Sequence, residues 1–260
     1  MILNKYLITR RGRQICSCLL NGEKTVEMHF DSPEGTRLGD IYIGKIQNIA
    51  RNIRAAFVEI APGIVGYLPL EDMKEPLYTK KGKSKGPQNG DELLVQVTRE
   101  AMKTKNMALS TRITLHGKYA VLTETADGVS VSSKLSSEQR EELRALLTDT
   151  LRAEASGADG EERPFSMRNR GWIVRTNAAA ASAQEVKEEV RALYGQYRSI
   201  LDAAMYRTCF SCLLRQPSRY LTRLDDLYSG SFDEIVTDDA DLFEEIRDYL
   251  RERRPGEEAL

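Results

Sequence analysis

Five short runs of β-branched and aromatic residues, between Ile41 and Leu115, constrain the fold of this chain more than any other feature. Gly, Pro and Asn residues separate most of these runs. The runs cover 41–49, 54–60, 64–70, 91–100 and 107–115. Short strands spaced by turn residues in this way are typical of a small closed barrel such as an OB-fold. We therefore predict a five-stranded β-barrel over residues 37–112.

The first 36 residues are too few to fold alone. Residues 13–30 form two strand patterns joined at Asn21-Gly22, the strongest short hairpin signal. An isolated hairpin is at best marginally stable in water. We therefore expect residues 1–36 to pair with strands after residue 113, so that the barrel is an insertion in one loop of a host domain.

Residues 113–260 alternate between strand and helix patterns, as in an α+β or α/β domain. We predict a hairpin over 117–135 that turns at Asp127-Gly128, followed by a helix over 136–154. Ser136 and Gln139 have the spacing of a capping box at the start of that helix. Further along, the patterns predict a strand over 171–176 and a final helix over 240–253.

A long amphipathic helix is predicted over 177–205, with Asn177 as its N-cap. Its apolar residues recur at steps of three and four, which places them on one buried face. These residues are Val186, Val190, Leu193, Tyr197 and Leu201.

The formal net charge is −1, so composition alone does not indicate a nucleic-acid binder. The charges are segregated, however, because the chain is acidic from Asp225 to Asp241 and basic between Tyr78 and Gly90. This distribution predicts a local basic face next to the barrel. The lysines of that stretch are Lys80, Lys81, Lys83 and Lys85.

The N-terminus lacks the apolar region of a secretory signal, and no window approaches the roughly 18 apolar residues that span a bilayer. We therefore expect a cytoplasmic protein with reduced thiols. The four cysteines are Cys16, Cys18, Cys209 and Cys212. A zinc site is an alternative, but the Cys-x-Cys spacing is against it and small apolar core residues explain them better.

Phe57 and Tyr67 lie on consecutive predicted strands of the barrel. Barrels of this type bind single-stranded nucleic acid by stacking bases on aromatic rings within a positive groove. The charges of Lys45, Arg51 and Arg54 agree with such a surface. The pattern alone slightly favours the other interpretation, in which Phe57 is a core residue.

Arg175 and Thr176 stand at the end of an apolar strand, directly before a predicted helix. A guanidinium, a hydroxyl and free backbone N–H groups together make an anion site. The alternative is a solvated Arg beside an ordinary helix cap. Asp238 and Asp239 fit a helix start better than a metal-binding catalytic pair, because adjacent carboxylates on a strand face opposite sides.

The segments 39–73, 93–122 and 171–178, taken together and in this order, resemble the ribonuclease E/G family. In that family an S1-type OB-fold is inserted in a split RNase H-like domain. The resemblance covers almost the whole chain and implies an α+β fold: residues 1–36 and 113–260 are the two parts of the RNase H-like domain, and 37–112 are the barrel. It also implies a single-strand endoribonuclease that acts in RNA processing and decay.

By this resemblance, Phe57, Tyr67 and Lys105 fall on the RNA-binding positions of the barrel. A second set matches the pocket that holds the 5′-monophosphate of the RNA. These residues are Gly117, Val121, Arg175 and Thr176. Asn106-Met107 replaces the small residues usual after the lysine, and Tyr67 is Phe in many members.

Cleavage in the family depends on two aspartates that hold magnesium in a following domain, and a zinc-binding Cys pair links its subunits. Neither feature is found up to Leu260, so we expect no catalytic residue, metal or cofactor in this chain. The resemblance thus predicts that this chain is the portion of such a ribonuclease that binds single-stranded, 5′-monophosphorylated RNA. It leaves open whether the chain forms an oligomer. The alternatives are a stand-alone RNA-binding or adaptor protein without nuclease activity, and a catalyst whose own acids bind magnesium.

Overall fold

The computed structural model describes residues 4–32, 35–73, 75–101, 106–156, 171–226 and 233–253. The chain divides into two compact units, which we describe separately. The central unit comprises Leu38–Arg215. The terminal unit comprises Met1–Arg37 together with Gln216–Leu260. Both units combine helices and strands, so the predicted α+β class is confirmed.

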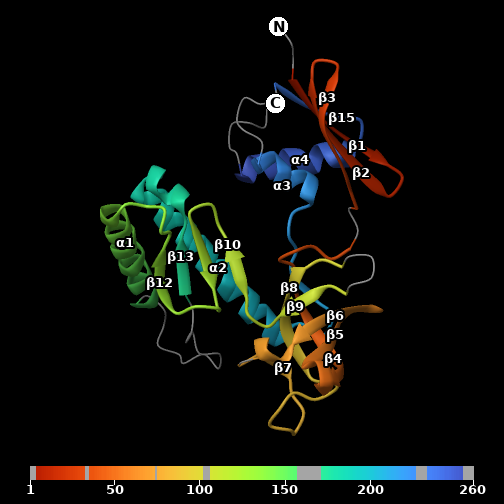
Figure 1. Ribbon diagram of the computed structural model, residues 1–260, viewed down its shortest axis with the longest axis vertical. Coiled ribbons are helices and arrows are strands. Elements are labelled where there is room, and N and C mark those ends of the chain that lie inside the picture. Colours follow the sequence, from red (N-terminus) through yellow and green to blue (C-terminus); the bar gives the residue numbers. More distant parts are fainter. Residues whose placement is uncertain are drawn as a thin grey trace. The chain divides into compact units, whose positions relative to one another are not determined.

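A closed five-stranded barrel occupies the first part of the central unit (Figure 1). Its strands follow the order β4-β5-β6-β9-β8, and β8 pairs back onto β4 to close the barrel. They are β4 (Ile41–Ala50), β5 (Ala55–Ala61), β6 (Ile64–Pro69), β8 (Glu92–Arg99) and β9 (Ala108–Ser110). Two short strands, β7 (Tyr78–Lys80) on β8 and β14 (Cys212–Leu214) on β4, extend the sheet. The predicted barrel is therefore confirmed.

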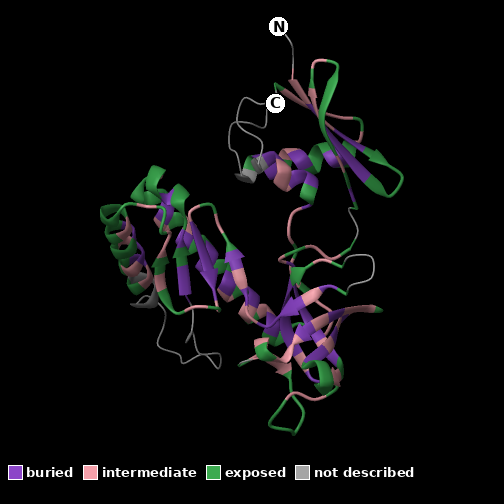
Figure 2. Ribbon diagram, viewed as in Figure 1, coloured by how far each residue is buried: buried purple, intermediate pink, exposed green. Residues whose placement is uncertain are grey.

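Alternating residues fill the inside of the barrel, which appears as a buried core in Figure 2. Ala56, Val58 and Leu68 are fully buried there. Gly66 makes room for Leu109, because a Cβ at Gly66 would lie 2.5 Å from the Leu109 Cδ1 atom. One predicted strand, 107–115, is divided: its first part is β9 and its second part is β10 (Thr114–His116) in the next sheet.

The second sheet of the central unit has the order β10-β11-β13-β12. It contains β11 (Ala120–Thr123), β12 (Gly128–Val131) and β13 (Gly171–Val174), and β12 runs parallel to β13. The predicted hairpin over 117–135 is wrong, since β13 lies between β11 and β12. The chain does reverse its direction at Asp127-Gly128, but the two strands that flank this turn are not hydrogen-bonded to each other. Strand β13, which comes more than 40 residues later in the sequence, lies between them.

Two helices complete the second sheet's core. In α1 (Ser137–Ser156) the predicted capping box is present: Gln139 N donates to Ser136 Oγ and Ser136 N to Gln139 Oε1, each at 3.2 Å. In α2 (Ala183–Tyr206) the N-cap is Ser182, which forms a capping box with Glu185. The predicted cap at Asn177 is wrong, because Asn177 lies in the short 3₁₀ helix η3 (Thr176–Ala180).

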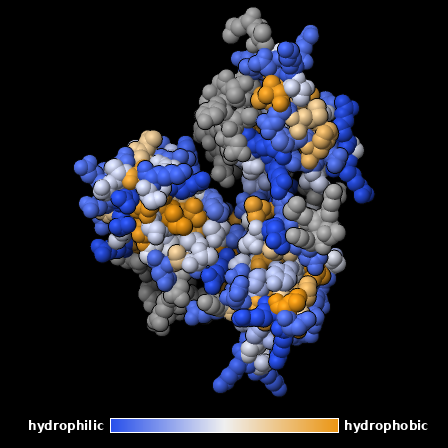
Figure 3. All heavy atoms as spheres, viewed as in Figure 1, coloured by the Kyte–Doolittle hydropathy of each residue, from blue (hydrophilic) through white to orange (hydrophobic). Residues whose placement is uncertain are grey.

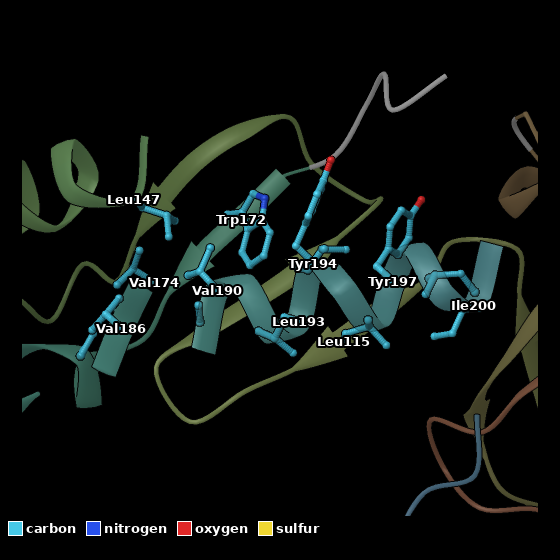
Figure 4. Packing of buried hydrophobic residues seen from close by; sticks show 14 of the residues in the cluster. Leu115, Leu147, Trp172, Val174, Val186, Val190, Leu193, Tyr194, Tyr197 and Ile200 are labelled. Carbon is cyan, nitrogen blue, oxygen red and sulfur yellow. The ribbon is translucent and has the colours of Figure 1, made fainter. Parts of the chain in front are cut away.

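Figure 4 shows how α2 packs on the sheet, with Val190 and Leu193 directed at Trp172 and Leu115. Four of the five residues predicted for the buried face are buried, and Leu201 is partly buried. Gln96 of β8 joins the barrel to this sheet. Its buried side chain donates to Thr114 O and accepts from Thr114 N, both at 2.8 Å.

The terminal unit is a sheet of order β15-β1-β2-β3 with two helices on one face. Its strands are β1 (Asn4–Arg11), β2 (Gln14–Asn21), β3 (Lys24–Asp31) and β15 (Glu234–Thr237). The β2–β3 hairpin turns at Asn21-Gly22 as predicted, and β1 pairs in parallel with β15. The first residues of the chain therefore pair with a strand that follows the barrel. Sequence reasoning missed β1.

The helices of this unit are α3 (Arg219–Asp226), which was not predicted, and α4 (Ala240–Arg253), which was. Cys16 and Cys18 are buried on β2, so they do act as small apolar residues, whereas Cys212 of the central unit is exposed. The described residues of 113–215 belong to the unit that contains the barrel, and the described residues after 215 belong to the unit that contains the terminal strands. The assignment of 1–36 and 113–260 to one RNase H-like domain stays a prediction.

Candidate RNA interface

Phe57 and Tyr67 lie side by side on the outside of the barrel. They are register partners on β5 and β6, and their ring centroids are 6.4 Å apart at an interplanar angle of 75°. Both rings are partly exposed, and neither belongs to the barrel core. Strand alternation explains this, because the neighbours Ala56 and Leu68 point inward. The core interpretation of Phe57 is therefore wrong.

Basic residues accompany this aromatic pair. Arg51 and Arg54 are exposed at the turn that leads into β5, where Arg54 adopts the left-handed conformation (φ 51°). Lys105 lies outside the described residues. Two positions later, Met107 O accepts a hydrogen bond of 2.8 Å from Tyr67 N, so the segment that follows Lys105 joins the barrel beside the ring pair.

The lysine-rich loop between β7 and β8 is organised around a buried carboxylate. Asp91 accepts hydrogen bonds from Gly82 N at 2.8 Å, Gln88 N at 3.0 Å and Lys81 Nζ at 3.0 Å. Burial alone would raise the pKa of Asp91, but these donors together lower it below its ordinary value. Lys81 is thus a structural residue. Lys80 at the end of β7 is exposed, as are Lys83 and Lys85 on the loop, whose surface ranges from hydrophilic to intermediate (Figure 3).

Gly117 and Arg175 meet at the turn between β10 and β11. The Arg175 guanidinium donates to Gly117 O at 2.7 Å, and Arg175 N donates to Tyr119 O at 2.7 Å. Thr176 follows as an exposed residue. Val121 is buried on β11, opposite Ile173 of β13. The structure therefore brings three of the four predicted residues to one exposed corner and buries the side chain of the fourth.

His116 also belongs to this corner, although sequence reasoning did not select it. It precedes Gly117 and is the register partner of Val121. Its pKa is lowered, because desolvation of the ring disfavours the charged form and the charge of Arg175 repels it. The position of His116 directly before Gly117 was the one sequence signal for it.

The long α-helix that was predicted to begin next to Arg175 does not begin there, because the short 3₁₀ helix η3 follows Arg175 instead. Helix α2 begins at Ala183, and its cap Ser182 accepts from Glu185 N. Within η3, Ala178 N already donates to Arg175 O at 3.1 Å. The side chains of Arg175 and Thr176 therefore stand at the start of a short 3₁₀ helix and not at the N-terminus of the long helix α2.

Asp238 and Asp239 have structural partners. Thr9 Oγ1 donates to Asp238 Oδ1 at 2.6 Å, and Arg10 Nε donates to Asp239 Oδ2 at 2.6 Å. Asp239 also caps α4 by accepting from Leu242 N at 3.0 Å, which confirms the helix-start interpretation. Across the described ranges, no three His, Cys, Asp or Glu side chains are grouped to hold a metal.

Comparison with known proteins identifies the family to which this fold and site belong. Residues 114–260 match the model described as the ribonuclease E/G family. The chain belongs to the ribonuclease E/G family. Residues 36–112, which contain the barrel and its aromatic pair, match the S1 RNA binding domain. The sequence resemblance to this family is therefore confirmed.

Several ribonucleases E and G are similar to this family member. It is 31% identical to ribonuclease E of Nostoc sp. (strain PCC 7120 / SAG 25.82 / UTEX 2576) over 85% of the chain and 31% of that protein. It is 26% identical to ribonuclease E of Haemophilus influenzae, over 91% of the chain and 25% of that protein. Ribonuclease G of the same organism is 26% identical over 84% of the chain and 44% of its own length. The chain thus spans less than half of each of these relatives.

The described residues contain no helix with the length and apolar character that crossing a membrane requires.

Proposed function

We propose that this ribonuclease E/G family chain binds single-stranded RNA by stacking bases on Phe57 and Tyr67. The observation that carries the proposal is the partly exposed ring pair outside the core of a barrel that matches the S1 RNA binding domain. Each stacked base contributes roughly 1–3 kcal/mol in such sites. Arg51, Arg54 and the exposed lysines of the β7–β8 loop supply positive charge for the phosphate backbone.

The same proposal places the 5′-monophosphate of the RNA at Arg175 and Thr176. Arg175 is held by its hydrogen bond to Gly117 O, and a guanidinium has five N–H donors, so others can face a phosphate. Charge-assisted bonds from Arg to phosphate are among the strongest in proteins. The role that follows is recognition of monophosphorylated RNA ends by a protein of RNA processing and decay.

Binding of two otherwise identical single-stranded RNAs tests the proposal. Fluorescence anisotropy with a 3′-labelled RNA that carries either a 5′-monophosphate or a 5′-hydroxyl gives both dissociation constants. We expect tighter binding of the monophosphate, by about tenfold or more, since hydrogen bonds to a charged group contribute about 1.5–3 kcal/mol. Arg175→Ala should remove this preference, and Arg152→Ala, an exposed arginine of α1, should keep it. Equal wild-type affinity for both RNAs would refute the phosphate site.

Cleavage is not assigned to any described residue. By the family resemblance it needs magnesium-binding aspartates, and the acidic pair at Asp238 and Asp239 is engaged in structural bonds. Incubating the same RNAs with the chain and Mg²⁺ separates the alternatives: cleavage that Asp238→Asn abolishes would favour a catalyst. A cytoplasmic location and an oligomeric state stay predictions.

A further inference from the structure

One carboxylate on helix α2 holds the whole β10–β11 turn. Glu189 Oε2 accepts a hydrogen bond of 2.7 Å from Lys118 N. Glu189 Oε1 accepts from Tyr119 N at 2.7 Å and from Ala120 N at 2.9 Å. Consecutive backbone N–H groups that converge on one anion form a nest, which favours negative charge. Here a side chain of the protein itself supplies that charge.

This carboxylate and the Ala120 carbonyl together leave little space for a side chain at Gly117. A Cβ at position 117 would lie 2.5 Å from Glu189 Oε1 and 2.9 Å from Ala120 O, closer than Cβ atoms approach other atoms. The restriction comes from space and not from an unusual backbone conformation, because Gly117 is not among the residues with positive φ. The glycine that matched the family's phosphate pocket therefore has a local structural reason.

The two chemical ends of the turn have different partners. The backbone N–H groups of the turn donate to Glu189. The carbonyls of the turn accept from Arg175: Gly117 O from its guanidinium and Tyr119 O from its backbone N–H, each at 2.7 Å. The position of Gly117 O fixes where the Arg175 guanidinium is anchored. Displacement of the turn would therefore move the guanidinium with it.

We infer that Glu189 is the positioning residue of the 5′-phosphate site. It fixes the turn that orients Arg175, and it fills the nest, so that an incoming phosphate is bound by Arg175 and Thr176 and not by the amides of residues 118–120. The inference rests on the proposed phosphate site. It predicts the direction of the change in phosphate affinity. Removal of a negative charge near a phosphate should by itself strengthen phosphate binding, but loss of Glu189 weakens it.

Glu189→Gln is the decisive variant. Glutamine keeps the size and the helix propensity of glutamate but sets an NH₂ group against backbone N–H donors. We expect the preference for the 5′-monophosphate over the 5′-hydroxyl to fall about tenfold, the equivalent of about 1.4 kcal/mol, while affinity for the 5′-hydroxyl RNA stays unchanged. Glu188→Gln is the matched control, because Glu188 is the neighbouring residue of α2 and bonds only Gln184 among the described residues.

Nuclear magnetic resonance of the unmutated chain tests the same point without a variant. Titration with a 5′-monophosphorylated dinucleotide should shift the Arg175 Nε–H signal and leave the amide signals of Lys118, Tyr119 and Ala120 in place. Large shifts of those three amides would show that phosphate displaces Glu189, and would overturn the inference.

The outcomes for the variant are equally distinct. An unchanged or increased preference in Glu189→Gln would overturn the positioning role and leave the phosphate site standing. A wild-type chain without any preference would refute the phosphate site itself and the inference with it.

Discussion

Replacing Phe57 or Tyr67 by alanine separates a stacking platform from a packing role. The ring centroids are 6.4 Å apart in an edge-to-face arrangement on the outside of the barrel. The residues next to them on the strands, Ala56 and Leu68, point inward into the barrel core. If bases stack on them, each substitution removes RNA affinity while the barrel stays folded. If the rings serve packing, the substitution lowers stability and leaves affinity unchanged.

The structure sets the expected magnitudes. Loss of one stacked base costs roughly 1–3 kcal/mol, which weakens RNA binding about 5- to 150-fold. Loss of an edge-to-face pair costs about 0.5–1.5 kcal/mol of stability. Because the rings are only partly buried, we expect a total loss of stability of about 1–2 kcal/mol. A fully buried Phe→Ala change costs roughly 3–5 kcal/mol, so the two roles are distinguishable.

The assay pairs RNA binding with unfolding. Anisotropy with a 5′-hydroxyl single-stranded RNA measures the barrel without the phosphate site, and urea unfolding gives the stability of each variant. Phe243→Ala is the control, since this ring on α4 is 54% exposed and lies in the terminal unit. Affinity within about twofold of wild type, combined with a stability loss above about 3 kcal/mol, would refute the stacking platform.

Three further predictions concern the loop and core of the barrel. Replacing Lys80, Lys83 and Lys85 by alanine should reduce the slope of log Kd against log salt concentration by up to about 2, since each contact with single-stranded phosphate contributes about 0.7. An unchanged slope would exclude the loop from RNA contact. Asp91 has a lowered pKa, so its contribution to stability is present above about pH 3.9 and is lost as pH falls through the lower folded value. Asp91→Asn should therefore destabilise the chain at pH 7 by about 2 kcal/mol and flatten the acid limb of a urea-unfolding series. Gly66→Ala should lower stability by about 1–3 kcal/mol because its Cβ would meet Leu109, and an unchanged melting temperature would contradict this packing.

Local patterns succeeded where the physical cause is itself local. The barrel strands, the final helix and the Ser136–Gln139 capping box follow from residues a few positions apart, whose spacing sets strand alternation or helix capping. The start of α2 was recoverable too: Ser182 followed by Glu185 is a capping-box signature, and it competes better than Asn177.

Pairings between distant segments were beyond such patterns. Nothing near Asp127-Gly128 indicates that β13 enters between β11 and β12, because the strands that flank a turn can each pair with a third strand. The division of the second half of the chain between two units has the same origin. Each amphipathic helix has to bury its apolar face against a sheet, and the sequence does not say which sheet that is.

The sequence by itself determined the barrel, its aromatic pair and, through the family resemblance, the Gly117 and Arg175 corner. Only the tertiary structure decided that both rings face outward, that His116 lies beside Arg175, and that Glu189 holds the turn. The reason is physical: strand periodicity is written in neighbouring residues, whereas Glu189 meets the three amides only after α2 has packed on the sheet, about 70 residues along the chain.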